Sequence, residues 1–161
     1  MPAVDHEKFM RRAIELSALA GLDFETGGPF GAVVVKDNQI VAEGMNRVIA
    51  SHDPTWHGEM EAIRLACITL QSSKLTGCSL YTTSAPCPMC VAASYWAGIE
   101  RIYFSTTVED TLKYGQFDNR FLYKQLALPA DERTVCLTQI MPGEGIEVWQ
   151  KYHAKQDSAA R

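Results

Sequence analysis

The sequence lacks any long apolar run. No hydrophobic stretch approaches the roughly 18 consecutive residues that are needed to span a bilayer, so we expect no transmembrane helix. The chain starts with a polar segment (Asp5, His6, Glu7 and Lys8), and we therefore expect neither a signal peptide nor a membrane anchor. Low-complexity tracts, internal repeats, linkers and long charge blocks are also absent. These absences exclude the fibrous and disordered classes and indicate an ordinary soluble globular protein.

An excess of basic residues is absent too. The 161 residues carry a formal net charge of −4, and because phosphate binding usually needs a basic face, a nucleic-acid partner is not expected. A local basic patch within an acidic total is still compatible with this count. The length suits one domain that buries a full core, so we expect a single domain over residues 1–161.

Cysteines are few and irregularly spaced. The five are Cys67, Cys78, Cys87, Cys90 and Cys136. An odd number at such spacing is not typical of a secreted disulfide framework, and it indicates a reducing, cytoplasmic location. Cys67, Cys78 and Cys136 lie in apolar stretches, and we expect each of them to pack in the core.

The sequence does contain two short motifs rich in metal ligands. His57-Gly58-Glu59 is followed later by Pro86-Cys87-Pro88-Met89-Cys90. A ring nitrogen of His57 and the thiolates of Cys87 and Cys90 can fill three corners of a tetrahedron, and an open fourth corner is typical of a catalytic zinc. Zinc lowers the pKa of bound water towards ~7. Glu59 is then placed to move protons between that water, the ring under attack and the leaving group.

Other interpretations of these residues stay open. A structural zinc site would need a fourth ligand, which Cys67, Cys78 or Cys136 could offer. A thioredoxin-type redox pair would use Cys87 and Cys90 alone. Glu59 argues against a purely structural site, because such a site has no use for an unligated carboxylate beside the metal.

Apolar periodicity predicts alternating helices and strands. Helices are expected over residues 5–20 and 57–70, from the Cys-x-x-Cys segment to about residue 97, near 108–114 and 119–127, and in the tail. Strands are expected over 31–35, 40–44, 78–83, 101–104 and 134–140, with a hairpin turn at Lys36-Asp37-Asn38-Gln39. This order predicts an α/β fold with a mixed sheet covered by helices on both faces.

Both metal motifs fall at predicted helix N-termini. The positive end of each helix dipole favours ionised thiols at Cys87 and Cys90. His57 and Glu59 are two residues apart and would not share one face of a regular helix. They can converge on one point only if the helix begins between or beside them.

With these motifs in place, the chain resembles the cytidine deaminase superfamily and, more narrowly, the small bacterial guanine deaminases. Further matching segments are Gly28-Pro29-Phe30-Gly31-Ala32, Glu43-Gly44-Met45-Asn46, Asp53-Pro54-Thr55, Tyr95-Trp96-Ala97, Phe117-Asp118-Asn119 and Pro129-Ala130-Asp131-Glu132-Arg133-Thr134. The resemblance implies a three-layer α/β/α fold with a five-stranded mixed sheet and one zinc ion per subunit. It also implies a homodimer in which the C-terminal segment, about residues 141–161, can be exchanged between subunits.

The resemblance further implies a set of substrate-binding residues. Asn46 would hydrogen-bond the purine, Asp118 would accept from its N–H groups, and the main-chain N–H of Gly58 would contact the base carbonyl. Phe30 and Trp96 would complete the pocket. An Asn suits a purine edge because one amide both donates and accepts. Judged from the residues alone, Asn46 is equally compatible with a turn residue, Asp118 with a helix cap and Trp96 with simple packing.

Some residues depart from the family pattern. Many relatives carry Glu directly before the Pro-Cys pair and Ala in the middle of the His-x-Glu motif. The departures are Ala85, Gly58, a bulky Trp56, and a tail without a terminal Tyr, in which Tyr152 and His153 are the nearest candidates. The zinc chemistry is unaffected by these changes, whereas the choice of substrate depends on them.

The sequence therefore predicts a zinc-dependent hydrolase that deaminates a free aminated purine, with guanine to xanthine plus ammonia as the leading reaction. Alternative small substrates are a triazine, a pterin or guanosine, and the macromolecular alternative is adenosine in a tRNA loop. A zinc-stabilised binding module is the alternative from outside the enzymes.

Overall fold

The computed structural model describes residues 4–159, which fall into two compact units divided between Tyr123 and Lys124. The four strands and both clusters of the hydrophobic core lie in the first unit. The ends of the predicted 1–161 domain, and the last two residues of its C-terminal segment, lie outside the described residues.

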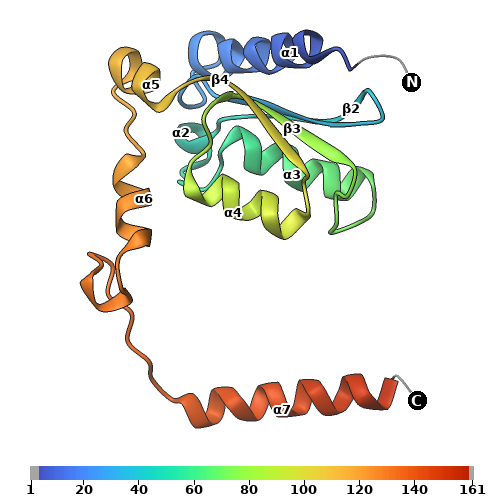
Figure 1. Ribbon diagram of the computed structural model, residues 1–161, viewed down its shortest axis with the longest axis vertical. Helices are drawn as coiled ribbons and strands as arrows, with labels where there is room; N and C mark the ends of the chain where they lie inside the picture. Colours follow the sequence, from blue (N-terminus) through green and yellow to red (C-terminus); the bar gives the residue numbers. More distant parts are fainter. Residues whose placement is uncertain (1–3, 160–161) are drawn as a thin grey trace. The chain divides into compact units, whose positions relative to one another are not determined.

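A four-stranded mixed sheet forms the centre of the first unit (Figure 1). The strands are β1 (Gly31–Lys36), β2 (Gln39–Met45), β3 (Cys78–Ser84) and β4 (Arg101–Thr106), in the spatial order β2-β1-β3-β4. β1 pairs antiparallel with β2 and β3, whereas β3 and β4 are parallel. Asp37 and Asn38 turn the hairpin with φ of 48° and 61°, which is the backbone that tight hairpins favour. The hairpin predicted from the sequence is thus confirmed.

Helices cover both faces of this sheet, which confirms the predicted three-layer architecture (Figure 1). One face carries α1 (His6–Ala18), which continues as a π-helical turn, η1 (Leu19–Asp23). The other face carries α3 (Gly58–Thr69) and α4 (Pro88–Ala97). A short helix, α2 (Val48–Ser51), follows β2.

The side chains of β1 explain why both faces need a cover. Ala32 and Val34 belong to the core cluster beneath α3, whereas Val33 and Val35 belong to the cluster that includes Phe9 of α1. A central strand buried on both faces has no polar side to present to water. The unbroken apolar run in the sequence therefore indicates a strand that is buried on both faces.

The chain after β4 is mainly helical, with α5 (Val108–Gly115), α6 (Arg120–Ala127), the 3₁₀ turn η2 (Ala130–Glu132) and α7 (Pro142–Ala159). The predicted strand over 134–140 is wrong, and the sheet of the described residues has four strands instead of five. Alternating side chains are compatible with a strand, but a strand also needs a hydrogen-bonded neighbour, and residues 134–140 have none in this chain. None of the described helices could cross a membrane.

The three extra cysteines differ in burial. Cys78 is buried in the core and Cys67 packs half-buried against it, as predicted. Cys136 is exposed, contrary to the prediction, because the segment that carries it forms no strand on which to pack.

Gly44 allows α3 to lie directly against β2. A Cβ at this position would collide with the carbonyl oxygen of Gly58 and with the main-chain nitrogen of Ala62, both in α3. Because Gly58 is the first residue of α3, this contact sets how closely the helix N-terminus approaches the sheet.

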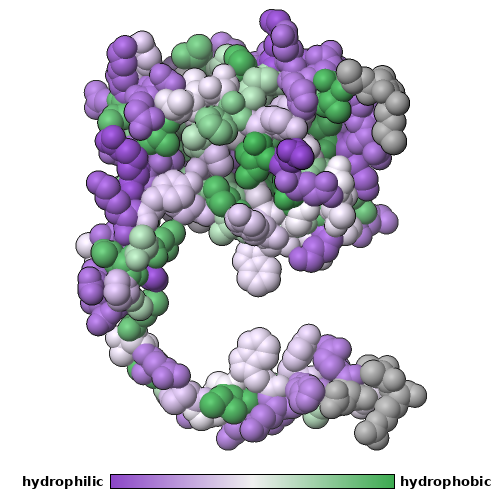
Figure 2. Space-filling view, in the orientation of Figure 1, coloured by the Kyte–Doolittle hydropathy of each residue, from purple (hydrophilic) through white to green (hydrophobic). Residues whose placement is uncertain are grey.

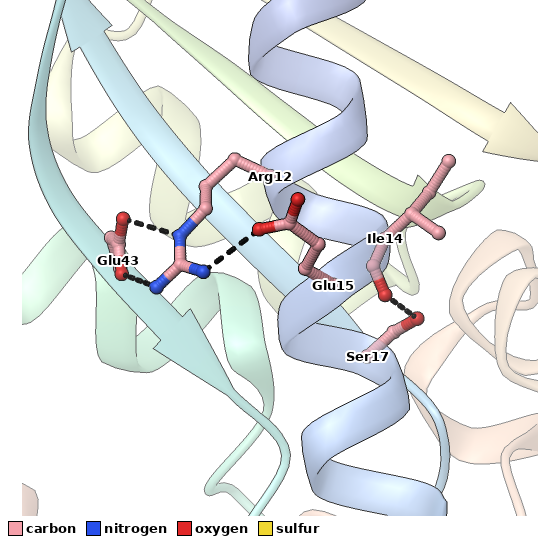
Figure 3. Close-up of polar contacts among 5 residues, drawn as sticks. All are labelled: Arg12, Ile14, Glu15, Ser17 and Glu43. Atoms are coloured by element: carbon pink, nitrogen blue, oxygen red, sulfur yellow. Dashed lines mark hydrogen bonds and ion pairs between the residues drawn. The ribbon is translucent and has the colours of Figure 1, made fainter.

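An ion pair ties α1 to β2 on the surface of the first unit (Figure 3). Nε and Nη2 of Arg12 donate to the two carboxylate oxygens of Glu43 at 2.8 and 2.6 Å, and Nη1 donates to Glu15 at 2.9 Å. The hydrogen bonds from Arg12 hold the pKa of the Glu43 carboxyl below its usual value. Two-point contacts of this kind are the stronger form of surface ion pair.

We expect Glu43→Gln to lower the free energy of unfolding by about 1 kcal/mol at pH 7 and low salt. A lowered pKa in the folded state stabilises the protein above the unfolded carboxyl pKa of ~4.3, and this stabilisation is lost as the pH falls through the folded value. Urea unfolding at pH 7 and at pH 3 measures the difference between variant and parent. The exposed pair of Glu7 and Arg11 supplies the control, because Glu7→Gln should change stability by less than about 0.5 kcal/mol. An equal effect of Glu43→Gln at both pH values contradicts this account.

Candidate active site

The three predicted metal ligands meet where two helices begin. Nδ1 of His57 lies 3.7 Å from Sγ of Cys87 and 3.6 Å from Sγ of Cys90, and the two sulfurs are 3.7 Å apart. A tetrahedral zinc with Zn–N of ~2.1 Å and Zn–S of ~2.3 Å would separate the nitrogen from each sulfur by about 3.6 Å and the two sulfurs by about 3.8 Å. The donor set therefore fits zinc. Within the described residues it is a group of three, with no fourth ligand from Cys67, Cys78 or Cys136.

The backbone at both helix starts leaves these side chains available. His57 is the N-cap residue of α3, and Cys87 is the N-cap residue of α4. Both have extended φ and ψ, and neither side chain caps its own helix. Pro88 in the first turn of α4 costs no hydrogen bond, because the N–H that a proline lacks would have no intrahelical partner at this position. The prediction that α3 must begin beside His57 and Glu59 is confirmed.

The two sulfurs share a hydrogen bond that favours ionisation of one of them. This contact lowers the pKa of Cys87 to about 4 and, together with burial, raises the pKa of Cys90. The Cys87 thiolate and the Cys90 thiol are therefore the favoured forms before any metal binds. Zinc binds thiolates, so its arrival would release the remaining thiol proton.

Glu59 lies beside this donor set as a buried carboxylate. Its Oε1 accepts a hydrogen bond of 3.1 Å from the Thr82 hydroxyl on β3. Burial raises the pKa of Glu59, because the charged form loses its hydration, and the Thr82 hydrogen bond opposes that effect only in part. A carboxyl with a raised pKa is suited to both accepting and returning a proton near neutral pH.

A cavity of about 320 Å³ opens over the donor set. His57, Glu59 and Cys87 form its floor, while Phe30 and Phe117 stand edge-to-face in its wall with ring centroids 5.0 Å apart. The remaining lining residues are Gly28, Asn46, Val48, Ile49, Pro54, Ser84, Ala85, Thr111, Asp118, Asn119 and Leu122. A mostly apolar cavity with a few convergent polar groups is typical of a small-molecule site.

Asn46 is buried at the edge of this cavity and is held on several sides. Its main-chain N–H donates to the Phe30 carbonyl at 2.9 Å, and its carbonyl accepts from the Thr26 hydroxyl at 2.7 Å. Its side-chain Oδ1 accepts from the main-chain N–H of Val48 at 3.1 Å, as in a turn. The Nδ2 group donates to no other described residue. The turn role and a donor role towards a ligand are therefore compatible in one side chain.

Asp118 lines the cavity but has partners of its own. Its carboxylate accepts from the main-chain N–H and the guanidinium of Arg120, at the first residue of α6. This is the helix-start role that the sequence left open. The contact of 2.7 Å between Nη2 of Arg120 and Oδ2 of Asp118 is also an ion pair.

Two predicted pocket residues are not part of the cavity lining. Gly58 is buried at the start of α3, with its Cα side packed against Phe30, Gly31 and Gly44. Trp96 is 80% exposed on α4. Helical geometry explains this position, because Cys90, Ser94 and Ala97 share the buried side of α4 and Trp96 points elsewhere. The prediction that Trp96 borders the pocket therefore finds no support within one chain.

Thr82 and Glu61 are site residues that the sequence analysis missed. Thr82 holds Glu59, and Glu61 holds the two neighbours of Asn46. A Thr in a strand and a Glu in a helix are ordinary residues, so no sequence pattern marks either of them. Only their burial beside functional groups distinguishes them.

Comparison with known proteins gives a consistent result. The family described as the cytidine and deoxycytidylate deaminase zinc-binding region matches residues 3–106. The guanine deaminase of Bacillus subtilis strain 168 is 42% identical over 157 residues, which cover 96% of this chain and 99% of that relative. The crystal structure of guanine deaminase from Bacillus subtilis aligns with a TM-score of 0.86 at 43% identity, covering 93% of this chain and 94% of that one.

Other matches are more partial. The tRNA-specific adenosine deaminase of Aquifex aeolicus is 41% identical over 100 residues, covering 62% of this chain and 64% of that relative. A solved structure in complex with 2,6-diaminopurine aligns with a TM-score of 0.67 at 29% identity, covering 74% of this chain and 65% of that one.

We expect Cys90→Ser to abolish stoichiometric zinc binding, because a hydroxyl is a much poorer zinc ligand than a thiolate. Zinc per chain is measured by atomic absorption after dialysis against a weak chelator. Cys136→Ser is the matched control, because Cys136 is exposed and outside the donor set, and this variant should keep its zinc. Zinc loss in the Cys136 variant instead would indicate a structural site with four ligands.

Proposed function

Since the chain belongs to the cytidine and deoxycytidylate deaminase zinc-binding family, we propose that it is a zinc-dependent hydrolase that converts guanine to xanthine and ammonia. The observation that carries the proposal is a three-ligand donor set, two members of which line the cavity, beside the buried carboxylate of Glu59, which lines the same cavity and is not one of the three ligands. The similarity to a guanine deaminase covers 96% of this chain, whereas the similarity to a tRNA-specific adenosine deaminase covers 62% of it. This difference in coverage favours a free purine as the substrate.

His57, Cys87 and Cys90 hold the metal. A zinc ion at this site supplies Lewis acidity, which makes hydroxide available near neutral pH. Two thiolates and a neutral imidazole balance the charge of the ion, so the site suits a neutral heterocycle better than an anion.

Glu59 is the proton shuttle. Its Oε1 accepts from Thr82, which fixes the orientation of the carboxylate at the cavity. Glu59 takes a proton from the attacking water and gives it to the ring nitrogen next to the carbon under attack. It then takes the second proton from the hydroxyl now on that carbon and delivers it to the departing amine, so the C–N bond breaks, ammonia leaves and the ring carbonyl of xanthine forms. The Glu59 pKa, raised by burial, suits this exchange of protons.

Asn46 and Asp118 recognise the base in complementary ways, since Asn46 donates a hydrogen bond to it and Asp118 accepts hydrogen bonds from it. Val48 occupies Oδ1 of Asn46, so Nδ2 is the group that donates to a purine acceptor. Asp118 accepts from the N–H groups on the guanine edge, a role that its negative charge favours. Gly58 contributes a main-chain N–H from the first turn of α3, where helix N–H groups have no intrahelical partner. Phe30 packs against the flat face of the ring.

The alternative substrates are less well supported. Adenosine in a tRNA loop would require basic tracks, and the chain has a net charge of −4. A triazine, a pterin or guanosine would use the same chemistry, and Ala85 and Trp56 are the departures that bear on that choice. A product pair of xanthine and ammonia would place the enzyme in purine catabolism, and the odd number of irregularly spaced cysteines favours a cytoplasmic location.

Guanine turnover by zinc-loaded protein is the direct test. Turnover is monitored by the loss of guanine ultraviolet absorbance, and ammonia is assayed in parallel. We expect Glu59→Gln to lower turnover by roughly 10²- to 10⁴-fold, because proton transfer by a positioned acid–base group contributes that much. Zinc content and circular dichroism should match the parent. The control Glu109→Gln changes an exposed carboxylate on α5 and should keep full activity. Residual activity of Glu59→Gln near the parent level would contradict the mechanism.

We also propose that the enzyme is a homodimer in which the C-terminal segment, about residues 141–161, is exchanged between subunits and closes the partner's site. Taken by itself, the second unit exposes Ile146 (53%), Val148 (67%), Trp149 (72%) and Tyr152 (55%), and Figure 2 shows apolar side chains on its surface. In the first unit β4 is an edge strand, and Trp96 on α4 is exposed. Apolar surface of this extent is typical of an interface.

Light scattering after size-exclusion chromatography should give about twice the 17.9 kDa of one chain. We expect Trp149→Arg to shift the mass towards the monomer, because a charged group would replace an aromatic side chain that is 72% exposed in one chain and is proposed to be buried against the partner. Gln150→Arg adds the same charge at a neighbouring polar position of α7 and should leave the dimer intact. A monomeric parent, or equal effects of the two variants, would overturn this proposal.

A further inference from the structure

Glu61 joins the helix of the metal site to the loop of the base-binding residue. It lies on α3, with a side chain that is 13% exposed. Its Oε2 accepts from the main-chain N–H of Met45 at 2.8 Å, and its Oε1 accepts from Nε of Arg47 at 3.0 Å. Met45 and Arg47 are the two residues on either side of Asn46. One carboxylate thus holds both neighbours of the residue that faces the purine.

The other contacts of Asn46 do not involve α3. They come from Phe30, Thr26 and Val48, which lie before β1 or after β2. Among the described residues, Glu61 is the α3 side chain that hydrogen-bonds to residues 45–47. The same helix begins beside His57 and carries Glu59. Glu61 is therefore the side-chain link between the proton shuttle and the base-binding amide, beside the main-chain hydrogen bond from Arg47 to Trp56 and the packing of Gly44 against α3.

We infer that Glu61 is a positioning residue for base recognition, which acts through Asn46 and never touches the substrate. This inference rests on the proposed function. Both partners of Glu61 are donors, so the role needs two acceptor oxygens on one side chain. A glutamine offers one acceptor and one donor, and so it can satisfy Met45 or Arg47 but not both. Glu61→Gln thus loosens the loop while it keeps the size of the side chain.

The simpler alternative is an ordinary surface ion pair that contributes only to stability. The pair of Arg12 and Glu43 provides a control for that alternative (Figure 3). Arg12 and Arg47 have the same side-chain exposure of 36%, and Glu43 lies on β2, two residues before Met45. The Arg12–Glu43 pair ties α1 to the sheet, however, and makes no contact with Asn46.

Kinetics of Glu61→Gln and Glu43→Gln, normalised to bound zinc, separate the two roles. We expect Glu61→Gln to raise KM for guanine roughly ten- to hundredfold, with kcat within about threefold of the parent, because a displaced binding group weakens substrate positioning. Glu43→Gln should leave both constants within about twofold. A KM of Glu61→Gln equal to the parent's would overturn the inference. If Glu61→Gln does not fold, Arg47→Met removes one of the two bonds and is judged by the same KM criterion.

A double-mutant cycle tests whether the effect passes through Asn46. In an Asn46→Ala background, Glu61→Gln should change kcat/KM by less than about twofold, because the group that it positions is already gone. Independent, multiplicative effects of the two substitutions would contradict a positioning role.

A substrate-free measurement separates this inference from the proposed function. In ¹⁵N-labelled, zinc-loaded protein, the side-chain amide signals of Asn46 are assigned by their loss in Asn46→Ala. We expect these signals to shift in Glu61→Gln and to stay in place in Glu43→Gln. Unchanged amide signals in Glu61→Gln would refute the positioning role whatever the substrate is. Failure of the parent to deaminate guanine would refute the proposed function alone, and the amide signals would still decide the role of Glu61.

Discussion

Tetrahedral zinc tolerates little error in the spacing of its ligands. This requirement determines how the helices and the sheet of the first unit are arranged. The three donor atoms must lie about 3.6 to 3.8 Å apart, although they come from two helices that are distant in the sequence. Both helices begin at a ligand with extended backbone, and neither start is capped by its own side chain. Two helix ends therefore give up a local stabilising contact, and metal binding offsets that loss. The sheet beneath them serves as the frame that holds the two starts together.

Much of this frame could be predicted from the sequence, because it depends on local patterns. The hairpin at Asp37 and Asn38, the unbroken apolar strand β1 and the helix starts at His57 and Cys87 each follow from a few neighbouring residues. The donor set was predictable for the same reason, since His-x-Glu and Cys-x-x-Cys fix which atoms are available. The resemblance to a known family added the layer arrangement, and the comparisons agree with it.

The failures are cases where a distant contact decides. Residues 134–140 alternate like a strand, but no neighbour pairs with them in this chain, so alternation alone was misleading. Trp96 was expected at the pocket from the family resemblance, and because it is 80% exposed on α4 in one chain, that role stays a prediction that depends on a second subunit. Thr82 and Glu61 were invisible, because their roles come from partners on other elements rather than from their own sequence context.

Gly44 shows how such a contact limits the evolution of the enzyme. The glycine does not line the cavity and lies within a strand, where many residues would satisfy the sheet. Its missing side chain nevertheless sets the distance between β2 and the first turn of α3. Every replacement would have to lift that turn, and with it His57 and Glu59, away from the cysteines of α4. Substitutions at Gly44 are therefore not tolerated unless α3 changes at the same time. A residue outside the active site thus evolves under the same constraints as the residues within it.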